Sequence, residues 1–173
     1  IFTTKEDLLR SIRKIKSVHS MKKICFISSC GGHLMELKQL FPIAKGYQYY
    51  IVTEKNEVTK NEIKSGKSYF LFQQERRNWK FIFIFLFNIC KSLYILARER
   101  PTHIFTTGAG AVFPTCLMGK IIGARIVYIE SFAKINSKSM TGKLIYLFAD
   151  RFYVQWKEML KVYPKALYYG PVY

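Results

Sequence analysis

The chain has 173 residues, of which 50% are hydrophobic and 16% aromatic, so it can bury the core of one globular domain and is not a disordered chain. It carries 28 Lys and Arg against 11 Asp and Glu, a formal net charge of +17, which indicates an anionic partner: a nucleic acid, an acidic membrane surface or a phosphorylated substrate. The four cysteines form no CxxC pair and have no metal-ligand spacing, so we expect reduced, buried thiols and no metal site.

Residues 1–20 differ from the rest of the chain. Leu8, Ile12 and Ile15 recur at helical spacing with basic residues between them, which predicts a short basic amphipathic helix. The residues that follow, Met21-Lys22-Lys23, are typical of a natural start, so residues 1–20 are equally well read as an upstream extension. We therefore divide the chain into this segment and a domain over residues 21–173.

Strands and helices alternate from residue 21 onward. In chain order the pattern predicts a strand at 24–28, a helix at 34–40, strands at 49–53 and 69–72, a long helix at 78–98, a strand at 103–107, a helix at 111–122, a strand at 125–130, a helix at 139–148, a strand at 152–155, a short helix at 158–162 and a last strand at 167–169. Such alternation is typical of the α/β class. We expect a single Rossmann-like domain whose parallel sheet is covered by helices on both faces.

Two glycine turns each join a predicted strand to a helix. The first lies in "SSCGGHLMEL" and contains Gly31 and Gly32; the second lies in "TTGAGAVFP" and contains Gly108 and Gly110. Glycine lets the backbone approach a ligand closely, and the start of a helix suits a phosphate group. Neither turn is a complete GxGxxG or Walker motif, and either could serve only as a turn. In a parallel sheet both would lie at the carboxyl edge, where ligands bind.

His33 follows the first glycine turn, where a helix is expected to begin. The positive end of the helix dipole favours the neutral imidazole, which can accept a proton. His33 is therefore a candidate general base, and a purely structural histidine is the alternative.

The segment "ERRNWKFIFIFLFNICKSLYILARER" contains the long helix. Its uninterrupted apolar run, residues 81–87, is too short to span a membrane, and polar residues interrupt the rest. Most of the helix circumference is nevertheless apolar, so a second apolar face is left over after one face packs on the sheet. We expect this face to lie in an anionic lipid interface, with complete burial as the alternative. The residues expected at the membrane are Trp79, Lys80, Phe83, Phe87 and Lys91.

The ordered segments "SSCGGHLMEL", "TTGAGAVFPTCLMGKIIGARIVYIES", "SMTGKLIYLFADRFYVQW" and "YYGPVY" resemble a known family. The chain is similar to the acceptor-side subunits of split GT-B glycosyltransferases. These include the anchoring subunit of the eukaryotic dolichol-linked UDP-GlcNAc transferase and the bacterial glycosyltransferase enhancers of capsule and exopolysaccharide synthesis. The resemblance covers residues 22–173 and implies the N-terminal half of a GT-B enzyme. The nucleotide-sugar half is then expected as a separate chain, because this chain stops after one domain.

The resemblance also implies substrates and a location. The donor is a UDP-sugar held mainly by the partner chain, the acceptor is a polyprenyl-diphosphate-linked saccharide, and no cofactor or metal is needed. The protein is expected at the cytoplasmic face of the membrane, bound peripherally or weakly anchored. Eukaryotic members carry an N-terminal membrane span, and here only the basic segment 1–20 stands in that place.

Roles can be carried over residue by residue from the matching motifs. His33 and Glu130 are the two side chains able to remove the acceptor hydroxyl proton in an inverting sugar transfer; for Glu130 a loop-fixing or helix-capping carboxylate is the alternative. The expected substrate-binding residues are Gly31, Gly32, Gly108, Gly110, Ser131, Thr141 and Gly142. Gln155 and Trp156 match the Gln-Trp pair of the family, and we expect them at the partner interface.

Two other classes of function remain open. A self-sufficient Rossmann enzyme would need an acidic residue at the end of the second strand, and Glu54 nearly fits this requirement. A nucleic-acid-binding protein is supported by charge alone, since no RRM, zinc or helix-turn-helix signature is present, and we expect no nucleic-acid partner.

Overall fold

The computed structural model describes residues 22–56, 59, 66–73 and 81–172. Seven parallel strands form one sheet in the order β3-β2-β1-β4-β5-β6-β7. The strands are β1 (Lys23–Ile27), β2 (Gln48–Glu54), β3 (Lys67–Leu71), β4 (His103–Thr106), β5 (Arg125–Ile129), β6 (Arg151–Val154) and β7 (Leu167–Tyr168). The α/β Rossmann-like class predicted from the sequence is confirmed.

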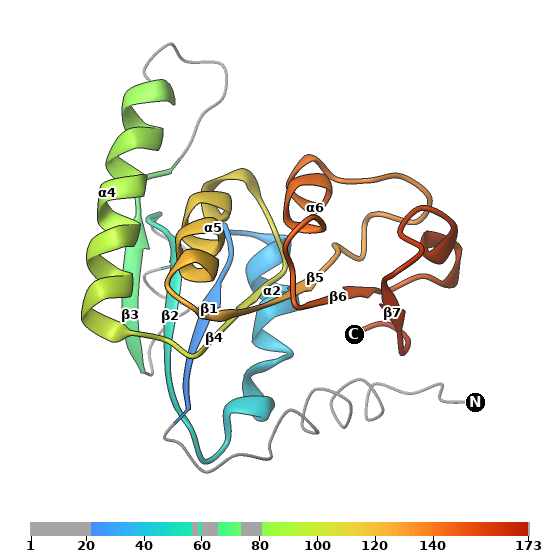
Figure 1. Ribbon diagram of the computed structural model, residues 1–173, viewed down its shortest axis with the longest axis horizontal. Helices are drawn as coiled ribbons and strands as arrows, with labels where there is room; N and C mark the ends of the chain where they lie inside the picture. Colours follow the sequence, from blue (N-terminus) through green and yellow to red (C-terminus); the bar gives the residue numbers. More distant parts are fainter. Residues whose placement is uncertain (1–21, 57–58, 60–65, 74–80, 173) are drawn as a thin grey trace.

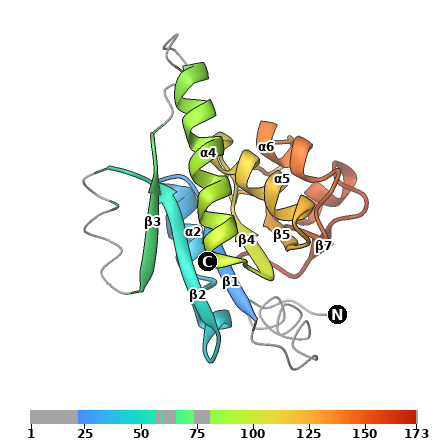
Figure 2. The same ribbon diagram turned by 60° about the vertical axis from the view of Figure 1, so that its left-hand side comes forward.

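Helices cover both faces of this sheet, as Figures 1 and 2 show. The α-helices are α2 (Gly32–Lys38), α4 (Phe81–Glu99), α5 (Phe113–Ile121) and α6 (Met140–Ile145), and the 3₁₀ helices are η2 (Phe41–Ala44), η3 (Gly110–Val112) and η4 (Lys157–Lys161). One core lies under α4, α5 and α6, and a second lies on the other face under α2 and η2. Side chains of a strand point alternately to the two faces, so in β1 Cys25 and Ile27 enter the first core while Ile24 and Phe26 enter the second.

The observed elements differ from the predicted ones mainly at their ends. Helix α2 begins at Gly32, two residues before the predicted start, and the chain continues past Pro42 as η2. The predicted helix at 111–122 is divided into η3 and α5, and Pro114 lies in the first turn of α5, where its missing N–H breaks no hydrogen bond. The short helix predicted at 158–162 is the 3₁₀ helix η4. The predicted N-terminal segment 1–20 lies outside the described residues.

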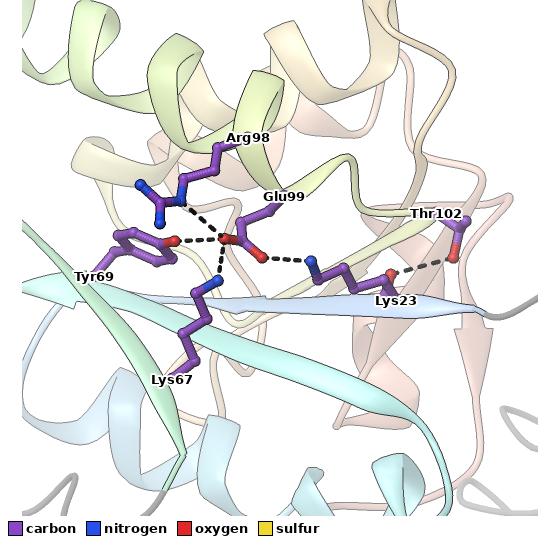
Figure 3. Close-up of polar contacts among 6 residues, drawn as sticks. All are labelled: Lys23, Lys67, Tyr69, Arg98, Glu99 and Thr102. Carbon is purple, nitrogen blue, oxygen red and sulfur yellow. Dashed lines mark hydrogen bonds and ion pairs between the residues drawn. The ribbon is translucent and has the colours of Figure 1, made fainter.

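Helix α4 runs antiparallel to the strands, and a buried carboxylate holds its last turn. Glu99 is 3% exposed and lies among donors from the amino ends of two strands (Figure 3). Lys23 of β1 and Lys67 of β3 form ion pairs with it, and the hydroxyl of Tyr69 donates a hydrogen bond to its Oε1. Burial alone would raise the pKa of this carboxyl, but the hydrogen bonds outweigh burial and lower the pKa to about 2.

The middle of α4 is held by two further polar contacts on its inner face. Asn88 is fully buried, accepting a hydrogen bond from the backbone N–H of Phe72 and donating one to its carbonyl, at 2.8 and 2.9 Å. Ser92 Oγ lies 2.6 Å from Thr115 Oγ1 of α5. Because Phe72 directly follows β3, Asn88 fixes the middle of α4 at the carboxyl edge of the sheet, and residues 81–87 extend beyond that edge (Figure 1).

The cysteines are unpaired, as expected, but not all of them are buried. Cys25 and Cys116 lie in the core under α4 and α5. Cys90 is exposed, which corrects the expectation, because it lies on the face of α4 opposite to Asn88 and Ser92.

The Glu99 contacts lead to a prediction about stability. At pH 7 Glu99→Gln should lower the free energy of unfolding by about 1–3 kcal/mol, because two lysines lose their anionic acceptor. The pKa of Glu99 is lower in the folded chain than in the unfolded chain, where it is about 4.3. The stabilisation is therefore fully present above pH 4.3 and is lost as the pH falls towards 2.

Urea unfolding of the wild type and the variant at pH 7, 4 and 3 measures this difference. The exposed Glu158→Gln is the matched control and should change the free energy of unfolding by less than about 0.5 kcal/mol. A difference for Glu99→Gln that stays constant down to pH 3 would contradict the role given to the carboxylate.

Candidate functional site

The candidate site lies where strand order changes direction. β1 and β4 are neighbours, with Ile27 opposite Thr106, and the chain leaves them towards opposite sides of the sheet. The carboxyl ends of such a pair of strands form the crevice in which α/β sheets bind ligands. Both glycine turns, Gly31-Gly32 after β1 and Gly108–Gly110 after β4, follow these two strands. The prediction that they share the carboxyl edge is confirmed.

The two turns are joined by a reciprocal pair of hydrogen bonds. Thr107 Oγ1 donates to the carbonyl of His33 at 2.6 Å, and His33 Nδ1 lies 2.9 Å from the carbonyl of Thr107. A carbonyl oxygen can only accept, so Nδ1 carries the proton and the neutral imidazole presents Nε2 as a proton acceptor. His33 is half-buried. The geometry thus fixes one tautomer of a side chain placed between the two turns.

The positions of the two turns differ in whether the fold requires glycine there. Gly31 has a φ of +75° and Gly108 a φ of +104°, a backbone conformation that other residues rarely adopt. A Cβ at Gly108 would lie 2.9 Å from the hydroxyl of Tyr128, whereas a Cβ at Gly32 would meet nothing within 4 Å. Gly32 is exposed and has no positive φ, so nothing within the fold requires glycine there. Its missing side chain leaves open space at the start of α2.

Glu130, the second candidate base, is surrounded by donors inside the domain. It is 1% exposed. Its Oε1 accepts from the hydroxyl of Tyr128 and the N–H of Ser131, and its Oε2 accepts from Ser139 N–H, Ser139 Oγ and the hydroxyl of Tyr163. Five donors on two oxygens hold the loop after β5 and the start of α6. This arrangement agrees with the alternative interpretation of Glu130, a carboxylate that fixes a loop.

Two residues expected to bind substrate, Gly142 and Thr141, lie in the first turn of α6, and Gly142 packs against Glu130. A Cβ at Gly142 would overlap Glu130 Oε2 and would also lie 2.7 Å from the hydroxyl of Tyr163. The N–H of Gly142 donates to Ser139 Oγ, which caps α6. Thr141 is 6% exposed. Both residues lie inside the domain, because α6 must approach the buried carboxylate closely.

Glu36 is a central residue of the site that the sequence reasoning missed. It is 4% exposed and accepts hydrogen bonds from Ser131 Oγ, the N–H of Phe132 and Gln155 Nε2 at 3.2, 3.1 and 3.4 Å. Burial raises the pKa of this carboxyl, against the lowering effect of these donors. Glu36 thereby joins α2 to the loop after β5. The signal that the sequence offers for this role is that Glu36 is the one acidic residue between the apolar residues at positions 34, 37 and 40.

Gln155 and Trp156 follow β6 and were expected at a partner interface. Gln155 is 2% exposed; its Nε2 donates to the carbonyl of Glu130, and its Oε1 accepts from the N–H of Val172. Its side chain therefore holds the C-terminal segment from inside the domain and does not reach a docking surface. Trp156 is half-buried, packs against the ring of Phe132 at a tilt of 42° and donates from Nε1 to the carbonyl of that residue.

The alternative of a self-sufficient Rossmann enzyme requires an acidic residue at the end of the second strand. Glu54 is the last residue of β2 and takes this position. It is 7% exposed, and Cys30 Sγ lies 3.7 Å from its Oε2. The carboxylate is thus largely shielded from a ligand. Within residues 22–56, 59, 66–73 and 81–172 no group of three or more His, Cys, Asp or Glu is placed to hold a metal ion.

The predicted second apolar face of α4 is present. The residues packed against the domain include Asn88, Ser92 and Glu99, so the inner face is partly polar. The exposed face carries Ile82, Phe83, Leu86, Phe87, Leu93 and Tyr94. By length and composition α4 could cross a membrane, and 22% of its 18-residue apolar window is buried in the domain. Lys91 is half-buried, with Nζ 4.9 Å from the ring centroid of Phe72, whereas Trp79 and Lys80 lie outside the described residues.

Comparison with known proteins identifies relatives along nearly the whole domain. A family model described as "Oligosaccharide biosynthesis protein Alg14 like" matches residues 24–172. Proteins named UDP-N-acetylglucosamine transferase subunit ALG14 from rat and human are each 25% identical over 177 residues, covering 86% of this chain and 82% of the relative. The subunit of the same name from Schizosaccharomyces pombe is 42% identical over 77 residues, which cover 42% of this chain and 37% of the relative.

Solved structures with the same fold are larger than this chain. MurG from Acinetobacter baumannii aligns with a TM-score of 0.64 at 16% identity over 79% of this chain, and UDP-N-acetylglucosamine 2-epimerase from Rickettsia bellii with a TM-score of 0.68 at 13% identity over 88%. The chain spans only 42% and 46% of these two structures. At such identities the likeness concerns the fold.

The packing around Gly142 and the open space at Gly32 predict that only the first of two glycine substitutions destabilises the fold. Gly142→Ala should lower the free energy of unfolding by about 1–3 kcal/mol, because the added methyl group displaces the Glu130 carboxylate from its donors. Gly32→Ala should change it by less than about 0.5 kcal/mol, because its Cβ meets open space. Thermal and urea unfolding of the two variants measure both values. Equal stability of the two variants would contradict the close approach at Gly142.

Proposed function

The chain belongs to the family of Alg14-like oligosaccharide biosynthesis proteins, and on this premise we propose that it is the acceptor-side subunit of a two-chain glycosyltransferase. Its rat and human relatives bear the name of UDP-N-acetylglucosamine transferase subunits. The observation that carries the proposal is the pair of glycine turns joined through His33 and Thr107 at the β1/β4 crevice. The nucleotide-sugar-binding half is then a separate chain that this subunit recruits and activates.

We propose that the reaction transfers a sugar from a UDP-sugar to a polyprenyl-diphosphate-linked saccharide. The setting that we propose is capsular or exopolysaccharide synthesis at the cytoplasmic face of a bacterial membrane. A net charge of +17 supports substrates and surfaces that carry phosphate. The open backbone at Gly31 and Gly32 supports the approach of a diphosphate or sugar group, and no cofactor is required.

In this proposal His33 acts as the general base. Its Nε2 removes the proton of the acceptor hydroxyl as that oxygen attacks the anomeric carbon, and the bond from that carbon to the phosphate oxygen breaks. UDP leaves with the bonding electron pair, held by the partner chain, and the configuration at the anomeric carbon is inverted. The hydrogen bond from Nδ1 to Thr107 supports this role, because it selects the neutral tautomer in which Nε2 is the acceptor. Glu130 holds the loop after β5 and takes no proton.

The apolar face of α4 supports peripheral binding to an anionic membrane. Asn88, Ser92 and Glu99, together with the apolar Ile95 and Leu96, hold the inner face of α4 on the domain. Most of its other apolar residues are exposed to water, which is an unfavourable environment for them. Phe83 and Phe87 are exposed by 56% and 64% and lie in the part of α4 beyond the carboxyl edge. A membrane bound there would lie beside the edge at which the acceptor is presented.

Reconstitution with the nucleotide-sugar half tests the proposed function. The purified chain alone should transfer little or no sugar to a polyprenyl-diphosphate saccharide, and addition of the partner should produce transfer. In the reconstituted pair His33→Ala should lower turnover by about 10²–10⁴-fold, the contribution of a positioned base. Pull-down of the partner should be unchanged, because the substitution leaves the outer surfaces of the domain intact.

Glu130→Gln is the control variant in this assay. Its effect should appear mainly as a lower melting temperature, because the amide replaces one of the two acceptor oxygens by an NH2 group that faces other donors. A large loss of turnover in Glu130→Gln at unchanged stability, with little effect of His33→Ala, would move the base to Glu130. Full turnover by the chain alone would overturn the two-chain proposal.

Sedimentation with vesicles tests the membrane proposal. The protein should pellet with phosphatidylglycerol vesicles and be partly released by salt, which screens the attraction of its lysines. The double variant Phe83→Ser/Phe87→Ser should partition at least about tenfold more weakly, because two rings no longer leave water. Ile121→Ser/Ile122→Ser is the control, since these exposed residues lie at the end of α5. Equal loss in both double variants would contradict a specific role for α4.

A further inference from the structure

Helix α6 exposes a stripe of large apolar side chains to water. Met140 and Leu144 lie one helical turn apart, and Leu147 follows in the turn after the helix. These three side chains are exposed by 65%, 46% and 81%. A group of exposed apolar side chains on one side of a helix is typical of an interaction surface. The three residues are called the α6 stripe below.

The packing of α6 fixes this stripe on the outside of the domain. On the inner side Ile145 is fully buried, and a Cβ at Gly142 would overlap Glu130 Oε2. Ser139 Oγ accepts from the N–H of Gly142 and donates to Glu130 Oε2 at 3.1 Å. Rotation of α6 to bury the stripe would therefore remove a donor from a buried carboxylate, which is unfavourable. The exposure of the stripe is a property of the fold.

The charge around the α6 stripe is positive. Lys138 precedes the helix, Lys143 lies within it, and both side chains are exposed. Of the six acidic residues in the described ranges only Glu158 is exposed, since Asp150 is half-buried and paired with Lys120 and the other four are buried. Apolar side chains bordered by lysines complement an anionic lipid surface, where the rings and chains leave water and the ammonium groups meet the headgroups.

The α6 stripe belongs to the same helical layer as the apolar face of α4. Helix α5 lies between α4 and α6 and contacts both, and the three helices cover one core on one face of the sheet (Figure 2). The start of α6 lies near the second glycine turn, because Ser139 Oγ is 3.3 Å from the hydroxyl of Tyr128, and a Cβ at Gly108 would lie 2.9 Å from that hydroxyl. The first turns of α4 and of α6 therefore reach the same edge of the sheet.

From this placement we infer that the α6 stripe is a second membrane contact, which binds the same anionic lipid surface as α4 and rests on the membrane binding proposed above. A single helix lying in the interface leaves the domain free to roll about the axis of that helix. Contact of Leu144 and Leu147 with the bilayer, to one side of α4, removes this freedom. The glycine turns are then held at a fixed distance from the membrane surface.

Sedimentation with phosphatidylglycerol vesicles tests the contribution of the stripe. Leu144→Ser/Leu147→Ser should partition at least about tenfold more weakly than the wild type, because two leucine side chains no longer leave water. Ile121→Ser/Ile122→Ser removes two exposed apolar side chains at the opposite end of α5 and should bind like the wild type. Unchanged partitioning of the α6 variant would overturn the inference and leave the role proposed for α4 intact.

A nitroxide spin label identifies what covers the stripe. The label is attached at Leu147→Cys in a chain in which Cys30 and Cys90 are replaced by serine, since the other two cysteines are buried. On vesicles this label should collide more often with oxygen, which concentrates in lipid, and less often with a water-soluble nickel chelate. A label at Lys45→Cys is the control, because Lys45 is exposed after η2 on the other face of the sheet and should stay open to nickel.

The same labels separate lipid from protein as the occupant of the stripe. Loss of nickel collisions at Leu147→Cys on addition of the nucleotide-sugar half without vesicles would assign the stripe to that chain and overturn the inference. Equal access of nickel with and without vesicles would also overturn it. A label at Phe87→Cys reports on α4 in the same chain. Shielding at Phe87→Cys alone leaves the proposed membrane binding of α4 standing, whereas free access at both labels contradicts that binding as well.

Discussion

The buried carboxylate of Glu130 imposes a constraint on which the site depends. A carboxylate removed from water costs several kcal/mol unless donors surround it, and here they come from its own loop, from the start of α6 and from Tyr163. Meeting this requirement fixes the loop after β5, and Gly142 is needed because a larger residue would displace the carboxylate. The fixed loop presents Ser131 to Glu36 of α2. The order imposed at Glu130 therefore reaches the helix whose first turn carries His33.

Helix α4 is held by an arrangement in which polar residues point inward. A surface helix of a soluble domain usually buries apolar residues and exposes polar ones. In α4 the inner face combines the polar contacts of Asn88, Ser92 and Glu99 with the buried Ile95 and Leu96, while Phe83 and Phe87 are exposed. The first half of the helix is thus held by Asn88 and exposes most of its apolar side chains. This partly reversed polarity supports the proposal that α4 lies between the domain and a lipid surface.

The fold could be predicted because its signals are local, and the roles of several site residues could not because they depend on distant partners. Strand and helix periodicity, with glycine turns after two strands, placed the elements and the shared edge correctly. The burial of Gln155 depends on Val172 and Glu130, and the central position of Glu36 depends on a loop 95 residues away. A motif match assigned Gly142 to substrate, whereas the packed structure shows that it makes room for a carboxylate. Motifs that match a family can thus serve the framework of a site.

The direction of α4 relates the apolar face to the candidate site. Glu99 binds lysines at the amino ends of β1 and β3, and Asn88 binds Phe72 just beyond the carboxyl end of β3. The first two turns of α4 therefore extend past the same edge that carries the glycine turns (Figure 2). The lipid-linked acceptor proposed for this chain would keep its lipid in the bilayer and its diphosphate at the surface, so its sugar could reach only a site close to the membrane. An apolar helix end on the same edge of the sheet as the crevice would meet this requirement of the proposal.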